Sequence, residues 1–124
     1  MKTALLIVGH GSKSLDAVNA FEKLVAFIKE KKRYEIVTGA HMELAEPGIT
    51  ETVDEIAKQD PEMIVIAPYF LYEGMHIKKD IPEMIEEMRI KYPGIKFKFA
   101  KPIGFEPMLA DIILKRAAEA EKEV

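Results

Sequence analysis

Four short apolar runs alternate with four longer amphipathic segments along the chain, and this alternation constrains the fold more than any other feature. Short apolar runs are typical of strands buried on both faces, and the segments between them repeat their apolar residues at helical spacing. The expected strands cover residues 3–9, 34–42, 63–67 and 95–100. The order βαβαβαβα predicts an α/β fold, an open four-stranded parallel sheet with helices on both faces.

Residues that favour helix starts follow the expected strands. Ser14 is the expected N-cap of the first helix, and prolines at 47 and 107 are expected to open the second and the last. Asp80, Pro82 and Glu83 predict the start of the third helix. For so short a chain the commonest strand order is 2-1-3-4, as in flavodoxin-like folds, and we adopt it.

Size and composition exclude several classes of protein. The 124 residues have the size of one domain and no Pro/Gly/Ser-rich stretch divides them, so we expect residues 1–124 to form a single domain. The chain has no cysteine, so any metal must be held by nitrogen and oxygen ligands. A net charge of −3 gives no general basic field for nucleic acid.

The apolar runs are also too short for a membrane or export role. Residues 4–8 are too few for the core of a signal peptide. The longest run, residues 63–72, contains Pro68 and falls short of the ~20 residues that span a bilayer. We therefore expect a cytoplasmic protein whose partners include neither a membrane nor nucleic acid.

Two of the chain's three histidines fall at the place where a ligand is expected. In an open parallel sheet, ligands bind outside the carboxyl ends of the strands, where the strand order reverses. For the order 2-1-3-4, that place lies between the first and third strands, whose following loops contain His10 and His76. A neutral imidazole binds divalent metals and accepts protons near neutral pH, so the pair predicts a metal-handling site.

An acidic third partner is expected in the segment after the second strand. Glu43 follows that strand and its carboxylate is expected to reach the same cleft, but Glu46 is a rival that spacing alone does not exclude. His41 lies within the strand and is expected to be structural. A His-Glu-His set with open positions would be an exchangeable nitrogen and oxygen site.

The same edge carries cationic and apolar residues suited to a flat anion. Lys13, Lys78, Lys79 and Lys101 predict a positive rim, and Phe70, Tyr72, Met75, Ile103 and Phe105 interleave with it and suit either a macrocycle or a dimer contact. Ser12, in the turn Gly9-His10-Gly11-Ser12, is placed to offer polar contacts to an anion. Nucleotide binding is disfavoured because neither glycine-rich nucleotide motif is present.

Three segments together resemble the class II tetrapyrrole chelatases. They are LLIVGHGS at the start, MELAEPGI over residues 42–49 and EGMHIKKDIP over residues 73–82, and the resemblance extends over essentially the whole chain. The chain is most similar to the short, single-domain branch of the CbiX type. In that family the residues that match His10, His76 and Glu43 are the metal ligands and catalytic groups.

The resemblance implies ATP-independent insertion of Co²⁺ into sirohydrochlorin, in anaerobic cobalamin synthesis. It implies that the metal is a substrate, that no cofactor is bound permanently, and that the protein works as a homodimer. Ni²⁺ or iron insertion into the same macrocycle is the nearest alternative, because a nitrogen and oxygen site binds Ni²⁺ at least as well as Co²⁺. A non-catalytic metal carrier or sensor is the alternative from another class.

Overall fold

The computed structural model describes residues 2–72 and 74–123, and for residues 75–77 it describes the backbone alone. Its strands form a parallel sheet in the order β2-β1-β3-β4, which confirms the predicted 2-1-3-4 topology. The strands are β1 (Thr3–Gly9), β2 (Ile36–His41), β3 (Met63–Pro68) and β4 (Lys96–Phe99). The helices are α1 (Leu15–Glu30), α2 (Ile49–Ala57), α3 (Met75–Lys91) and α4 (Pro107–Glu121).

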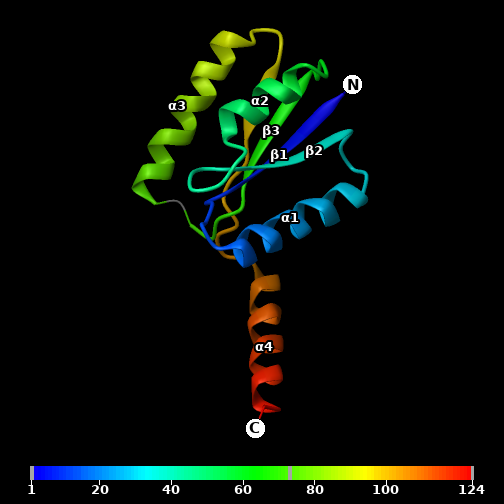
Figure 1. Cartoon of the computed structure of the whole chain (residues 1–124), viewed down its shortest axis with the longest axis vertical. Helices are drawn as coiled ribbons and strands as arrows, with labels where there is room; N and C mark the ends of the chain where they lie inside the picture. The colour runs from blue at the N-terminus through cyan, green and yellow to red at the C-terminus, as the bar shows by residue number, and fades with distance from the viewer. Residues whose placement is uncertain (1, 73, 124) are drawn as a thin grey trace.

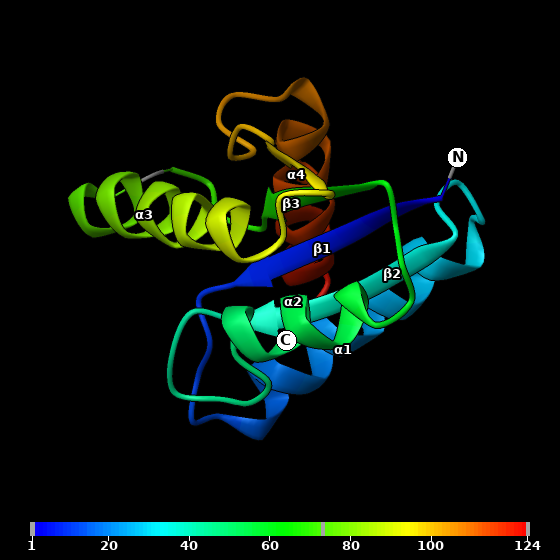
Figure 2. The ribbon, with the colours of Figure 1, turned by 90° about the horizontal axis from the view of Figure 1, so that it is seen from above.

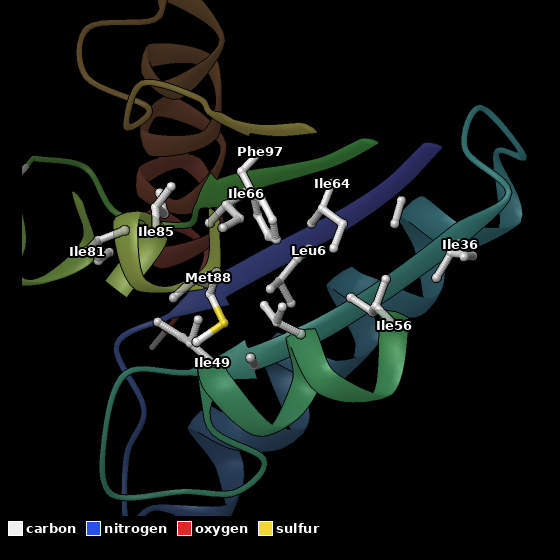
Figure 3. Packing of buried hydrophobic residues seen from close by; sticks show 14 of the residues in the cluster. Leu6, Ile36, Ile49, Ile56, Ile64, Ile66, Ile81, Ile85, Met88 and Phe97 are labelled. Carbon is white, nitrogen blue, oxygen red and sulfur yellow. The ribbon is translucent and has the colours of Figure 1, made fainter. Parts of the chain in front are cut away.

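Helices α2 and α3 cover one face of the sheet, and the main hydrophobic core lies beneath them. Leu6 of β1 and Ile66 of β3 are almost completely buried there, in contact with the cluster that includes Ile56 of α2 and Ile85 of α3 (Figure 3). Both central strands alternate between this face and the opposite one. The core therefore holds the two strands whose carboxyl ends flank the predicted ligand position.

Helix α1 covers the opposite face, over β1 and β2. Its Phe21 is buried against Ile7 and Val37 in a smaller cluster. Figure 2 shows α2 in front of the sheet and α1 behind it. Ser14 caps α1 as predicted, because its side chain accepts a hydrogen bond from the Ala17 N–H at 3.4 Å.

Two helices begin at residues other than those expected. Helix α2 begins at Ile49 rather than at Pro47, because the Pro47 carbonyl still accepts a hydrogen bond from the His41 N–H at the end of β2. Helix α3 begins at Met75 rather than near Asp80, so Pro82 lies inside it. Pro82 has no N–H to donate, but Ile81 is fully buried and its packing into the core keeps this part of the chain helical.

A polar cluster joins α2 to the end of α3. The Asp54 carboxylate accepts hydrogen bonds from the Tyr92 hydroxyl and, at 2.9 Å, from Lys91 Nζ. The hydrogen bond from Tyr92, followed by that from Lys91, holds the pKa of Asp54 below its usual value. The same bond raises the pKa of Tyr92. The cluster therefore favours an ionised Asp54 beside a neutral phenol.

Helix α4 projects away from the rest of the molecule (Figure 1). It begins at Pro107, as predicted, and contains no buried residue. It leaves the body from the edge where the carboxyl ends of the strands lie, on the side of the sheet that α1 covers (Figure 2). Within the described part of the chain, no helix has the length and apolar character that crossing a membrane would require.

Candidate active site

The segments that follow β1, β2 and β3 are held together by backbone hydrogen bonds, and we call this region the carboxyl edge (residues 10–14, 42–48 and 69–72). The Met42 N–H donates to the Gly9 carbonyl at 2.9 Å, and the Tyr69 N–H donates to the Val8 carbonyl at 2.7 Å. The Glu43 N–H donates to the His10 carbonyl at 3.3 Å. Residues far apart in the sequence therefore meet at the switch point predicted from the topology.

Gly11 allows the first two segments to approach each other closely. Its φ of +91° is in the left-handed region, and a Cβ at this position would stand 1.7 Å from the Glu43 carbonyl oxygen. Any side chain there would force the segments apart. Glycine at position 11 is thus required to keep His10 and Glu43 adjacent along the backbone.

The His10 imidazole is exposed and lies against the ring of Phe70. The two ring centroids are 4.0 Å apart, and the ring planes are tilted by 40°. Phe70 is only 2% exposed because it belongs to the main core cluster. The sequence predicted that Phe70 would contact a macrocycle or a dimer partner; it lines the outer pocket described below, and most of its surface is covered by protein.

His10 and Tyr69 lie on the wall between two pockets. The inner pocket, about 220 Å³, is lined by His10, Ser12, Phe21, His41 and Tyr69 among others. The outer pocket, about 490 Å³, is lined by His10, Tyr69, Phe70, Leu71, Tyr72, Ile103 and Leu109. Apolar and aromatic walls with a few polar groups are typical of small-molecule sites.

His41 has a place in the site that sequence reasoning did not anticipate. It is 3% exposed, and its ring centroid lies 5.0 Å from that of Phe21, which agrees with the structural role predicted for it. It also lines the inner pocket together with His10. The register pairs it with Gly9, so a known strand register would have placed it beside His10.

The remaining predicted site residues fall into two groups. Ser12 lines the inner pocket and accepts a hydrogen bond from the Ser14 N–H at 3.0 Å, whereas Lys13 is exposed. Tyr72 is 77% exposed at the outer pocket. His76 lies in the first turn of α3 rather than in a loop, and its side chain and that of Met75 are outside the described residues.

Two of the four lysines of the expected positive rim lie near the outer pocket. Lys78 and Lys101 line a shallow hollow of about 520 Å³, which shares Ile103 with the outer pocket. The side chains that the structure describes contain no group of three histidine, aspartate or glutamate residues arranged to hold a metal ion. The backbone brings His10 and Glu43 together, and a third ligand from α3 stays a prediction.

The chain is similar to known proteins over nearly its whole length. Residues 4–120 match the family model described as CbiX. The chloroplastic sirohydrochlorin ferrochelatase of Arabidopsis thaliana is 35% identical over 90% of this chain, which spans only 50% of that relative. The sirohydrochlorin cobaltochelatase of Methanopyrus kandleri is 31% identical over 94% of this chain and 96% of its own length.

A solved structure gives the same result. The sirohydrochlorin chelatase SirB from Bacillus subtilis subspecies spizizenii, in complex with cobalt, matches with a TM-score of 0.90 and 30% identity, over 96% of this chain and 51% of that chain. The unit described here thus occurs both as a chain of similar length and as about half of a longer one. The resemblance predicted from the three sequence segments is confirmed. The chain belongs to the CbiX family.

Proposed function

We propose that this protein inserts Co²⁺ into sirohydrochlorin without using ATP. The observation that carries the proposal is the position of His10, which is exposed between two pockets and held beside Glu43 by the backbone. The names of the relatives from A. thaliana and M. kandleri support the macrocycle, and the second supports the metal. An imidazole and a carboxylate form an exchangeable donor set, which suits a metal that must be released.

In the proposed mechanism, His10, Glu43 and His76 receive the metal ion and deliver it to the macrocycle. The role proposed for His76 rests on its sequence motif alone, since its side chain is outside the described residues. Two pyrrole N–H protons must leave as the metal enters the ring. The imidazole that the metal has left can accept one of them, and the Glu43 carboxylate can accept the other.

The outer pocket is the proposed place for the macrocycle. A flat ring can lie against Tyr72 and Leu71, which are 77% and 48% exposed, with one edge at His10. Its carboxylates would then reach Lys78 and Lys101 in the adjoining hollow. Ser12, Lys13 and Met75 are proposed as further substrate contacts.

We further propose that two copies work together as a homodimer. Relatives of about twice the length support this arrangement, because this chain spans only 50% and 51% of them. A cytoplasmic location, and the alternative that Ni²⁺ or iron is inserted in place of Co²⁺, stay predictions.

The test is to mix the protein with sirohydrochlorin and Co²⁺, Ni²⁺ or Fe²⁺ and to follow the absorbance of the macrocycle. We expect acceleration over the protein-free reaction with Co²⁺, and a loss of at least about 100-fold in the variant His10→Ala. His10 is exposed, so an unchanged melting curve would show that the variant is folded. No acceleration with any metal would refute the proposal, and metal binding without a spectral change would indicate a carrier.

A further inference from the structure

The inner pocket contains a buried imidazole whose nitrogens have no partner among the described residues. His41, at the end of β2, is 3% exposed and lines this pocket. Within residues 2–72 and 74–123, its ring takes part in no hydrogen bond or ion pair. Over the same residues, no side-chain nitrogen that is sealed from solvent lacks a partner. The ring nitrogens of His41 are therefore open to the pocket.

Packing alone does not account for a histidine at this position. The ring of His41 contacts Phe21, with the centroids 5.0 Å apart, and a phenylalanine could make the same contact. A buried imidazole has a donor and an acceptor nitrogen, and burial is costly unless these atoms are engaged. The nitrogens of His41 therefore call for a polar occupant of the inner pocket.

His10 supplies a second imidazole to the same pocket. The strand register pairs Gly9 with His41, so His10 follows directly at the end of the neighbouring strand. Both imidazoles line the inner pocket, and the Ser12 hydroxyl is a further polar group there. The walls from α1 are apolar, and they include Val18 and Phe21. Two imidazoles thus provide most of the polar character of the pocket.

The size and the donors of the inner pocket favour a metal ion. Its volume of about 220 Å³ is below the roughly 300–1,000 Å³ of small-molecule sites, which excludes a macrocycle. None of its described lining residues is a lysine or an arginine, so an anion would find no countercharge. Neutral imidazoles are good ligands for divalent first-row metals. A divalent metal ion with some of its water is the occupant that fits.

We infer that His41 and His10 hold an incoming divalent metal ion in the inner pocket before its insertion. The inference rests on the function proposed above and adds a loading position to it. His10 also lines the outer pocket, so it can stay bound while His41 is exchanged for the donors of the insertion site. A metal held by two imidazoles and water is exchangeable, as this transfer requires.

The loading position would let the two substrates arrive from different sides. The macrocycle is proposed to lie in the outer pocket, whereas the metal would enter through the inner pocket. A bound macrocycle would then leave the path of the metal open. Since both metal positions use His10, one ion would occupy either of them at a time. His41 would therefore govern metal uptake and not the proton transfers.

Metal binding without the macrocycle tests the inference directly. The variant Glu43→Gln/His76→Ala removes two donors of the proposed insertion site and keeps His10 and His41. We expect it to bind Co²⁺ in calorimetric titrations, and we expect the further change His41→Phe to weaken this binding at least about tenfold. If the double variant binds no Co²⁺, or if His41→Phe leaves the affinity unchanged, the loading position is wrong.

A matched control and a spectroscopic measurement accompany this titration. Thr52→Val in the same background also removes a buried polar group, since Thr52 is 5% exposed and donates to the Gly48 carbonyl at 2.7 Å. Thr52 lines neither pocket, so Co²⁺ affinity should not change. Co²⁺ is paramagnetic, and in the double variant it should shift the ring proton signals of Phe21. Unshifted Phe21 signals at saturating Co²⁺ would overturn the inference even if His41→Phe does not fold.

Kinetics separate the loading position from the proposed function. In the otherwise unmodified protein, His41→Phe should raise the KM for Co²⁺ at least about tenfold and leave kcat and the KM for sirohydrochlorin unchanged. Insertion with an unchanged KM for Co²⁺ would remove the loading position and keep the proposed function. Co²⁺ binding that depends on His41, without insertion of any metal, would keep the metal position and refute the proposed function.

Discussion

The backbone of Gly11 lies directly against the carbonyl of Glu43, so that a Cβ on Gly11 would stand 1.7 Å from that oxygen. This contact joins the segment after β1 to the segment after β2, and it sets how closely His10 and Glu43 can approach. The close approach of two backbones, rather than a side-chain interaction, thus determines the geometry of the candidate site.

Adding a single methyl group at this contact should damage the site. We expect Gly11→Ala to reduce metal insertion by at least about tenfold, because a displacement of about 1 Å at a reacting group has large effects on rate. Gly94→Ala is the control, since a Cβ at Gly94 meets nothing within 4 Å. Equal activity of the two variants would show that the spacing of the two segments does not matter.

The two rival glutamates can be separated by substitution. Both are exposed, so neither Glu43→Gln nor Glu46→Gln should change the melting temperature appreciably. We expect only Glu43→Gln to reduce insertion strongly, because only Glu43 is bonded through its backbone to His10. Initial rates measured at several Co²⁺ concentrations check this, and a larger loss in Glu46→Gln would reverse the assignment.

Truncation of Phe70 should lower stability, whereas truncation of Tyr72 should weaken substrate binding. Phe70 is 2% exposed, so Phe70→Ala should lower the free energy of unfolding by about 3–5 kcal/mol. Tyr72 is 77% exposed, so Tyr72→Ala should change stability by less than about 0.5 kcal/mol while raising the KM for the macrocycle. Urea unfolding and steady-state kinetics on both variants check this. Equal losses of stability and equal KM values in the two variants would contradict the prediction.

The Asp54 cluster predicts a dependence of stability on acid. The pKa of Asp54 is lowered in the folded chain by its hydrogen bonds from Tyr92 and Lys91. Its contribution is therefore fully present above the unfolded pKa, near 3.8, and is lost as the pH falls through the lower folded pKa. Asp54→Asn should melt at a lower temperature than the unmodified protein at pH 7, and the difference should shrink below about pH 4.

The size of this effect should be modest, because the Asp54 side chain is 34% exposed and solvent screens its interactions. Glu55→Gln is a suitable control, since Glu55 forms an exposed ion pair with Lys58 one helical turn away. If the difference in melting temperature between Asp54→Asn and the unmodified protein stays constant from pH 7 to pH 3, ionisation of Asp54 is not its cause.

The sheet could be predicted from the sequence because strands buried on both faces consist of short apolar runs. The short apolar runs at β1 and β3 predicted the strands, the commonest parallel order predicted the topology, and His10 lies at the switch point that this order defines. The start of α3 was wrong because Pro82, with Asp80 and Glu83, has the pattern of a first turn. Burial of Ile81 outweighed that local preference, and no local rule contains this information.

The candidate site was predicted only in part, for related reasons. The position of Glu43 beside His10 follows from strand order, but its closeness depends on a backbone contact at Gly11 that periodicity does not reveal. The place of His41 in the inner pocket depends on Phe21 and Tyr69, which come from other elements. The apolar residues along α4 indicate a helix face that needs a partner surface, but their pattern does not say which chain provides that surface.

The separation between the carboxyl edge and the main core has a consequence for how such proteins diverge. His10, Glu43 and Tyr72 are exposed on segments beyond the strand ends, whereas stability resides in the buried faces of the sheet. Substitutions at this edge are therefore expected to alter the proposed ligand preference at little cost to the scaffold. The relative named for iron and the relative named for cobalt match this chain over 90% and 94% of its length, as expected if metal preference is set at the rim rather than in the interior.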